Sequence, residues 1–230
     1  MEQTRARQNR EGTAAVIPAY NEAKHIGEVV RRTKQELDRV LVVDDGSTDE
    51  THKEARAAGA EVIVHPENLG KGESIKAGLR YWLERGLTWV VILDGDGQHR
   101  PEEIERMWSV AENDGAALLI GNRMNDVESM PRIRRFVNRY MSGKISAVCG
   151  QQVPDTQCGF RMLHRDLIPE VLTGANRFDY ETEMLFLASR KGFRIASVPI
   201  TTVYSDEVSS IHPIRDTLRF FKLMRRYRKG

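Results

Sequence analysis

The sequence predicts an α/β fold in which helices flank both faces of a single, mostly parallel sheet. Between residues 13 and 120, short apolar runs of strand length alternate with stretches whose apolar residues recur at helical spacing. Several of these runs end in polar or acidic residues, as strands do where an open α/β sheet binds its ligand. The chain has 230 residues, which is enough for one sizeable core.

Each helix and strand expected in the first half is predicted from residues within it or next to it. The run 13–18 is expected to be a strand that ends at Pro18, because proline lacks the N–H that a sheet ladder needs. Residues 26–37 carry apolar side chains at helical spacing and predict a helix. The helix after the second strand is expected to be capped by Ser47 or Thr48. The other expected strands are 40–43, 60–65, 89–93 and 116–120, and the other helices end near residues 58, 84 and 113.

The second half is less regular. We expect a polar loop at 124–131, a polar turn at 155–161, a strand at 160–164 and an extended segment at 193–204. The expected helices are 132–148, 165–172, one that ends near 191, and 213–228.

Composition excludes several classes of protein. The net charge of +2 predicts neither a nucleic-acid partner nor an acidic one. No run approaches the roughly 20 apolar residues of a membrane-spanning helix, and residues 1–13 lack the apolar core of a secretory signal. The two cysteines, Cys149 and Cys158, are too few for a disulfide framework. These features predict a cytoplasmic protein with reduced thiols.

Two carboxylates end the apolar run at residues 89–93. Asp94 and Asp96, with Gln98 beside them, offer the hard oxygen ligands that suit Mg²⁺ or Mn²⁺. The alternative is an Asp-Gly turn in which the acids only cap the next helix, and this stretch alone does not decide between the two.

Three strand ends are expected to deliver polar groups to one edge of the sheet, at residues 18–22, 44–47 and 94–98. A carboxylate in such a position can hold the ribose or the base of a nucleotide. Neither GxGxxG nor GxxxxGK[ST] follows the first strand, so we expect phosphate to be bound through a metal ion. For any single acid the alternative is a helix cap, but three acid-bearing ends together favour a binding site.

Four motifs resemble, in order, those of the family 2 glycosyltransferases. They are residues 16–22 (VIPAYNE), 43–49 (VDDGSTD), 68–72 (NLGKG) and 93–101 (LDGDGQHRP). The chain is most similar to the dolichyl-phosphate mannose synthase branch, in a form without transmembrane helices. The resemblance implies a GT-A fold and inverting transfer from a nucleotide-diphosphate sugar. It divides the chain into a flexible arm at 1–12, a GT-A domain at 13–205 and a basic amphipathic helix at 206–230.

The resemblance also implies which residues bind the donor. The metal pair is Asp94 and Asp96, with Gln98 as a further ligand. Lys71 either helps to shape the pocket or is an ordinary lysine at a helix start. The full set implied for the nucleotide sugar is Pro18, Tyr20, Glu22, Asp44 (as a support from behind), Asp45, Lys71, Asp94, Gly95 and Asp96.

On the acceptor side, Arg123 and the stretch 155–161 (DTQCGFR) resemble features of the polyprenyl-phosphate branch. Guanidinium groups match phosphate geometry, so Arg123 and Arg161 are expected to hold the acceptor phosphate, the alternative being surface ion pairs. Asp155 is expected to be a base or a positioning group. A phosphate acceptor is already largely ionised near neutral pH and needs no base. Glu181 and Glu183 match a glutamate of many relatives or suit a helix N-terminus.

Residues 214–229 mix bulky apolar groups with arginine and lysine, which suits a helix in the membrane interface, joined by the basic stretch 132–144. The alternative is a docked helix with a solvated basic face.

The expected reaction moves a hexose, mannose or glucose, from a GDP- or UDP-sugar such as GDP-mannose to a polyprenyl or dolichyl phosphate. It is expected at the cytoplasmic face of a membrane, with or without a membrane partner protein. The alternatives are a soluble saccharide, protein or small-molecule acceptor, or a nucleotide-sugar-binding module without turnover.

Overall fold

The structure is a computed structural model that describes residues 10–124, 132–174, 180–201 and 224–227. Within these residues, seven strands form one sheet in the order β3-β2-β1-β4-β6-β5-β7. The strands are β1 (Thr13–Ala19), β2 (Arg39–Asp44), β3 (Glu61–Val64), β4 (Trp89–Ile92), β5 (Leu118–Asn122), β6 (Arg161–His164) and β7 (Ile195–Pro199). All neighbouring pairs are parallel except those of β6, which runs antiparallel to β4 and β5. The predicted mostly parallel sheet is confirmed.

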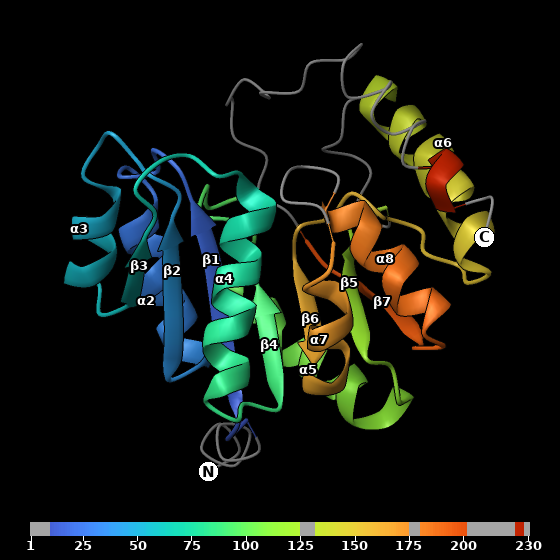
Figure 1. The fold of residues 1–230 in the computed structure, drawn as a ribbon, viewed down its shortest axis with the longest axis horizontal. Helices are drawn as coiled ribbons and strands as arrows, with labels where there is room; N and C mark the ends of the chain where they lie inside the picture. The colour runs from blue at the N-terminus through green and yellow to red at the C-terminus, as the bar shows by residue number, and fades with distance from the viewer. Residues whose placement is uncertain (1–9, 125–131, 175–179, 202–223, 228–230) are drawn as a thin grey trace.

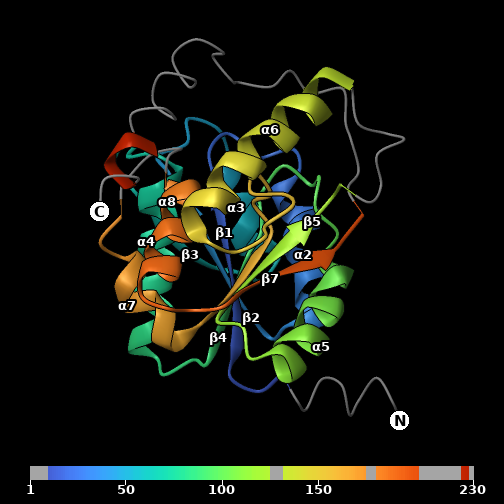
Figure 2. The ribbon, with the colours of Figure 1, turned by 90° about the vertical axis from the view of Figure 1, so that its right-hand side faces the viewer.

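Helices cover both faces of this sheet. They are α2 (Ile26–Glu36), α3 (Thr51–Ala57), α4 (Lys71–Glu84), α5 (Ile104–Asp114), α6 (Arg132–Cys149), α7 (Ile168–Val171) and α8 (Tyr180–Arg190), with 3₁₀ turns η1 (Pro101–Glu103) and η2 (Arg165–Leu167). Figures 1 and 2 show α4, α7 and α8 on one face and α2 and α5 on the other. The central strands are therefore buried on both sides, which explains their unbroken apolar runs.

The helices pack closely on the sheet. Gly78 of α4 lies against Val16 of β1, where an added Cβ would come within 2.4 Å of Val16 Cγ1. The glycine is needed here because any larger side chain would push the helix away from the strand.

The sheet register brings three strand ends to one edge. Ala19 at the end of β1 is paired with Asp44 at the end of β2. On the other side of β1, Val16 is paired with Ile92 of β4, and the Leu93 N–H donates to the Val16 carbonyl at 3.1 Å. Because the three strands are parallel neighbours, the polar residues that follow them meet at the same edge, as predicted.

Several element ends differ from the prediction. Helix α3 begins at Thr51, so neither Ser47 nor Thr48 caps it. Strand β7 ends at Pro199, and the predicted extension to 204 lies outside the described residues beyond 201. In the predicted arm, Arg10 is 7% exposed and forms an ion pair with Glu36 at 2.8 Å, so the described end of this arm packs on the domain.

The predicted C-terminal helix is described only at 224–227, which are helical, and the predicted boundary at 205 falls outside the described residues. Tyr227 is 7% exposed, its ring stacks on Phe186 at 4.9 Å, and its hydroxyl donates to Glu183 at 2.7 Å. Arg225 and Arg226 are exposed. These four residues therefore dock on α8 with a solvated basic side.

Among the helices described here, none has both the length and the apolar character needed to cross a bilayer.

Candidate active site

A network of hydrogen bonds ties the ends of β1 and β2 together. The Asn21 side chain accepts from the Thr48 N–H at 2.9 Å, and the Asn21 N–H donates to Ser47 Oγ at 2.9 Å. The Glu22 N–H donates to Thr51 Oγ1 at 2.8 Å. Asn21 has φ of 56°, a left-handed conformation that asparagine tolerates better than most residues. The side chains that were expected to cap α3 are used here to join the two loops.

Asp44 and Asp45 are both buried, at 0% and 3% exposure. Asp44 accepts from the Ser47 N–H at 2.8 Å and so holds the turn from behind, as the resemblance implied. Asp45 accepts from the N–H groups of residues 69 and 70 at 3.0 and 2.8 Å, and His65 Nδ1 lies 2.9 Å from it. The Asp45 carboxylate thereby fixes the turn that leads into α4.

The remaining residues implied at the first strand end lie where the motif places them. Pro18 is buried within β1, Tyr20 follows the strand with 45% of its surface exposed, and Glu22 is half-buried. The Tyr20 ring is therefore accessible at the edge where β1 and β2 end.

Asp94 lies in an ion pair that the motif spacing does not show. Lys71 Nζ, at the start of α4, lies 2.6 Å from Asp94 Oδ1 and 3.2 Å from Glu181 Oε1 of α8. Burial raises the pKa of Asp94, but Lys71 and then His99 lower it more, so it falls to about 2. Burial alone would lower the pKa of Lys71, yet the two carboxylates raise it above its ordinary value. Both groups are charged at neutral pH.

Asp96 and Gln98 complete the predicted metal set. Asp96 is half-buried, and its Oδ1 accepts from the Gln98 N–H at 2.9 Å. Burial and the negative charge of Asp94 raise the pKa of Asp96. In the described parts of the chain, no group of three or more acidic, histidine or cysteine side chains is arranged so that it could hold a metal ion by itself. Two repelling carboxylates with an amide nearby nonetheless fit Mg²⁺ or Mn²⁺, because such ions complete their shells with water and substrate phosphate.

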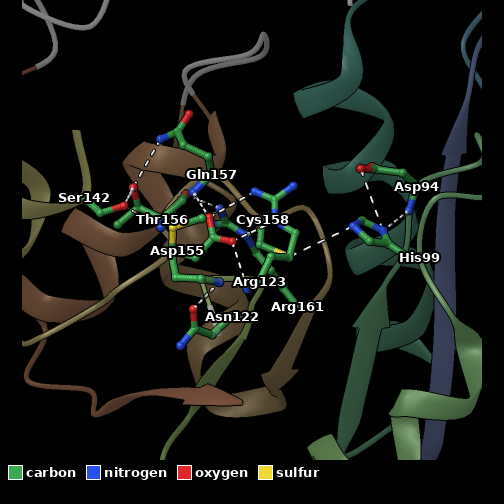
Figure 3. Close-up of polar contacts among 11 residues, drawn as sticks. Asp94, His99, Asn122, Arg123, Ser142, Asp155, Thr156, Gln157, Cys158 and Arg161 are labelled. Carbon is green, nitrogen blue, oxygen red and sulfur yellow. Dashed lines mark hydrogen bonds and ion pairs between the residues drawn. The ribbon is translucent and has the colours of Figure 1, made fainter. Parts of the chain in front are cut away.

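A glycine of the 155–161 loop lies directly against Asp94. A Cβ added to Gly159 would stand 2.5 Å from Asp94 Oδ2. His99, which follows the same motif, is 5% exposed, with Nε2 at 4.0 Å from Cys158 Sγ and Nδ1 at 3.9 Å from Asp94 Oδ2. Figure 3 shows these contacts joining the Asp94 side of the site to the cluster around Asp155.

Arg123 and Asp155 form a buried, two-pronged ion pair (Figure 3). Arg123 Nε and Nη2 donate to the two Asp155 oxygens at 2.7 and 3.0 Å, and the Arg123 N–H also donates to Asp155 at 3.2 Å. The residues are 6% and 1% exposed. The Gln157 N–H donates to Asp155 as well, at 3.3 Å. The Asp155 carboxylate therefore holds the Arg123 guanidinium in place, and both of its oxygens accept hydrogen bonds.

Arg161 is buried among backbone carbonyls. It is 0% exposed, and its guanidinium donates to the carbonyls of Cys158 at 3.0 Å, Thr156 at 3.1 Å and Glu181. In this arrangement Arg161 braces the loop 155–161 against α8, because all three acceptors are backbone groups of those segments. The structure thus brings Arg123 and Asp155 together but turns Arg161 away from the surface.

Sequence reasoning missed His99 and Gly159 and left Glu181 undecided. His99 and Gly159 both lie inside quoted motifs, so their presence beside the acids was a usable signal. The contact of Glu181 with Lys71 joins residues 110 positions apart, and no local pattern encodes it.

Comparison with known proteins agrees with this geometry. Residues 14–172 match the model of glycosyl transferase family 2. The chain is 30% identical to the UDP-N-acetylglucosamine–dolichyl-phosphate N-acetylglucosaminyltransferase of Methanococcus voltae, over 83% of this chain and 85% of the relative. It is 29% identical to the polyprenol monophosphomannose synthase of Mycolicibacterium smegmatis, over 82% and 76% of the two chains.

The fold also matches solved structures. Glucosyl-3-phosphoglycerate synthase from Mycobacterium tuberculosis, in complex with Mn²⁺, uridine diphosphate and phosphoglyceric acid, aligns with a TM-score of 0.70. The identity is 20%, and the alignment covers 98% of this chain and 78% of that one. This likeness identifies the sheet as that of a GT-A fold. Because the family model spans well over half of the sequence, the chain belongs to glycosyltransferase family 2 and is a glycosyltransferase.

Proposed function

We propose that the protein moves a hexose, mannose or glucose, from a GDP- or UDP-sugar to a polyprenyl or dolichyl phosphate at the cytoplasmic face of a membrane. The observation that carries the proposal is that one loop joins Asp94 to Arg123: Gly159 lies against Asp94, where an added Cβ would stand 2.5 Å from Oδ2, and Asp155 of the same loop pairs with the buried Arg123 at 2.7 Å. One group suits a metal-bound diphosphate and the other an acceptor phosphate. The relatives that act on dolichyl and polyprenol phosphates support this class of acceptor.

The donor is assigned to the edge where β1, β2 and β4 end. The exposed Tyr20 ring offers a stacking face for the base, and Glu22 and Asp45 border the same edge. Pro18 and Asp44 support it from within the sheet. Gly95 is buried, and an added Cβ would lie 3.3 Å from Ala19 Cβ, so the glycine lets the ends of β1 and β4 pack closely at this edge.

Asp94 and Asp96, with Gln98, would hold Mg²⁺ or Mn²⁺. When bound, the ion neutralises the charge that develops on the departing nucleoside diphosphate. Lys71 adds a further positive charge 2.6 Å from Asp94. Preorganised charge of this kind is often the largest single contribution to catalysis.

Transfer needs no general base. An oxygen of the ionised acceptor phosphate attacks the anomeric carbon from the side opposite the diphosphate. The new C–O bond forms as the bond to the diphosphate breaks, and the diphosphate leaves with the electron pair. Arg123, held in place by Asp155, positions the acceptor phosphate for this in-line attack. Inversion at the anomeric carbon follows from the single displacement.

The test is a donor screen with purified protein and Mn²⁺ or Mg²⁺. GDP-mannose, UDP-glucose and UDP-N-acetylglucosamine are each incubated with a polyprenyl phosphate, with phosphoglyceric acid and without acceptor, and lipid-linked sugar and free nucleotide are measured. Asp94→Ala should abolish transfer without unfolding the protein, whereas Asp38→Ala, at an exposed position, should leave it unchanged.

Each possible result of the screen leads to a different conclusion. Lipid-linked sugar formed from GDP-mannose or UDP-glucose supports the proposal, whereas transfer from UDP-N-acetylglucosamine alone would replace the hexose with an amino sugar. Turnover with phosphoglyceric acid alone would replace the lipid with a soluble acceptor, and nucleotide binding without turnover would make the protein a binding module. Full activity of Asp94→Ala, or activity that is indifferent to chelation of the metal, would overturn the assignment of the acids.

A further inference from the structure

Helix α6 is fixed to the domain by one of its faces. Asn138, Ser142, Ile145 and Cys149 are all 7% exposed or less, and they recur at helical spacing. Ser142 Oγ lies 3.0 Å from Thr156 Oγ1 and accepts from the Thr156 N–H at 3.0 Å. The direction of the opposite face is therefore set by contacts with the body of the protein.

That opposite face exposes large apolar side chains. Phe136 is 73% exposed, Tyr140 49% and Val137 44%. Within the described residues, the other large apolar side chains exposed to a comparable degree, Tyr20, Val64 and Leu69, lie far from α6 in the sequence. Three such residues within two helical turns make a contiguous apolar patch, which is the mark of an interaction site. Figure 1 shows α6 beyond α8 and β7, at the end of the molecule away from β3.

Basic side chains flank the two aromatic residues of the patch, Phe136 and Tyr140, on both sides. At about 100° per residue, Arg139 and Lys144 fall roughly 60–80° to either side of Phe136 around the helix axis. Both are exposed, and Lys144 Nζ lies 5.5 Å from the centre of the Tyr140 ring. Residues 132–149 contain five arginine or lysine residues and no acidic one.

We propose that this face of α6 is a docking surface for an anionic lipid bilayer. An apolar centre with cations on its flanks matches a helix lying in the plane of the interface, where rings enter the acyl boundary and long basic side chains reach the headgroups. A second copy of the same face is a poor occupant, because it would bring together the Arg139 and Lys144 side chains of two copies, four like charges, without an acidic partner. The buried and exposed faces of α6 lie on opposite sides of the helix, so the exposed face can lie on the bilayer while the buried face stays packed on the protein.

Docking would bring the acceptor side of the site to the membrane. Thr156, which bonds to Ser142 of α6, is adjacent to Asp155, the partner of Arg123. A polyprenyl phosphate keeps its chain in the bilayer and its phosphate at the surface, so a site next to a docked helix meets the phosphate directly. This consequence rests on the proposed function, but the docking itself does not.

The experiment is flotation of the full chain with phosphatidylcholine vesicles that contain or lack phosphatidylglycerol. Phe136→Ser with Tyr140→Ser should lower the partition coefficient at least about tenfold, since each aromatic side chain loses its transfer into the acyl boundary. Arg139→Glu with Lys144→Glu should remove the preference for phosphatidylglycerol. Matched controls are Val64→Ser, which is 45% exposed on β3, and Arg56→Glu, which is exposed on α3; both should bind like the unaltered protein.

The outcomes separate the alternatives once thermal unfolding shows that the variants fold. Unchanged vesicle binding by Phe136→Ser with Tyr140→Ser overturns the proposal, as does a dimer in sedimentation without lipid that the same variant dissociates. Equal binding to both kinds of vesicle overturns the role of the basic flanks. Transfer to a short-chain, water-soluble polyprenyl phosphate should persist in the variant. Loss of docking with that transfer intact leaves the proposed function standing, and docking without any transfer leaves this proposal standing alone.

Discussion

Gly159 gives the sharpest test of how the acids are placed. An alanine Cβ at this position would lie 2.5 Å from Asp94 Oδ2 and 3.1 Å from Asp94 Cγ. Ordinary carbon contacts are about 3.5–4.0 Å, so the Asp94 carboxylate must retreat by about 1 Å. The glycine has no left-handed φ, so the backbone itself tolerates alanine. The change therefore displaces one functional group.

The expected effects on rate and stability differ. A displacement of about 1 Å at a reacting centre can cost about 10²-fold in rate, and Asp94 would also leave its 2.6 Å contact with Lys71. The neighbour that must move is the end of a side chain, so the cost in folding free energy should stay at about 1 kcal/mol. Gly159→Ala should thus be nearly as stable as the unaltered protein and about a hundredfold slower.

The assay is release of nucleoside diphosphate, with Mn²⁺ affinity followed by calorimetry and stability by thermal unfolding. Gly143→Ala is the control, because its Cβ would meet nothing within 4 Å and it lies on an exposed helix. A Gly159→Ala enzyme within about threefold of normal turnover, with normal Mn²⁺ affinity, would show that the position of the Asp94 carboxylate does not limit transfer.

Three further predictions concern buried charge. Asp155→Ala removes the carboxylate that forms a buried ion pair with Arg123 and should cost about 3–5 kcal/mol in denaturant unfolding; an unchanged midpoint would contradict this. The pKa of Asp94 is lowered to about 2, so its pairing with Lys71 stabilises the fold fully above about pH 4 and is lost as the pH falls towards 2. In Asp94→Asn, the free energy of unfolding should therefore depend less on pH between these values and should keep its normal pH dependence between pH 6 and 8. An unaltered pH dependence between pH 2 and 4 would refute the pairing. Tyr227→Phe removes the hydroxyl that donates to a buried carboxylate of α8 and should cost about 1–3 kcal/mol in thermal unfolding. A variant as stable as the parent would mean that this docking adds nothing.

Much of the fold was predictable because burial on both faces leaves an unbroken apolar run at each central strand. The direction of β6 was not, since a short run such as 160–164 packs equally well in either orientation and its partners lie far away in the sequence. The start of α3 was misplaced for a related reason. Ser47 and Thr48 have the chemistry of helix caps, but the loop after β1 offers them other partners.

In the site too, features set by neighbouring residues could be predicted, whereas contacts between residues far apart in the sequence could not. Spacing alone placed Asp94 and Asp96 at a strand end, because the apolar run fixes where the strand stops. By contrast, the local sequence around an arginine in a polar turn does not show whether its guanidinium faces a ligand or the backbone. Arg123 and Arg161 were predicted alike, yet one pairs with a carboxylate near the edge of the site and the other is enclosed by carbonyls.

The loop 155–161 explains why these residue types occur together. Its aspartate fixes Arg123, its threonine bonds to α6, its glycine admits the Asp94 carboxylate, and its arginine ties the loop to the carbonyl that begins α8. The same helix α8 carries Glu181, which completes the contact with Lys71. Seven consecutive residues thus set the distance between Asp94, Arg123 and the exposed helix α6. A shift of this loop would disturb all three at once, so under the proposed function the contacts that hold the loop matter to the reaction as much as to the fold.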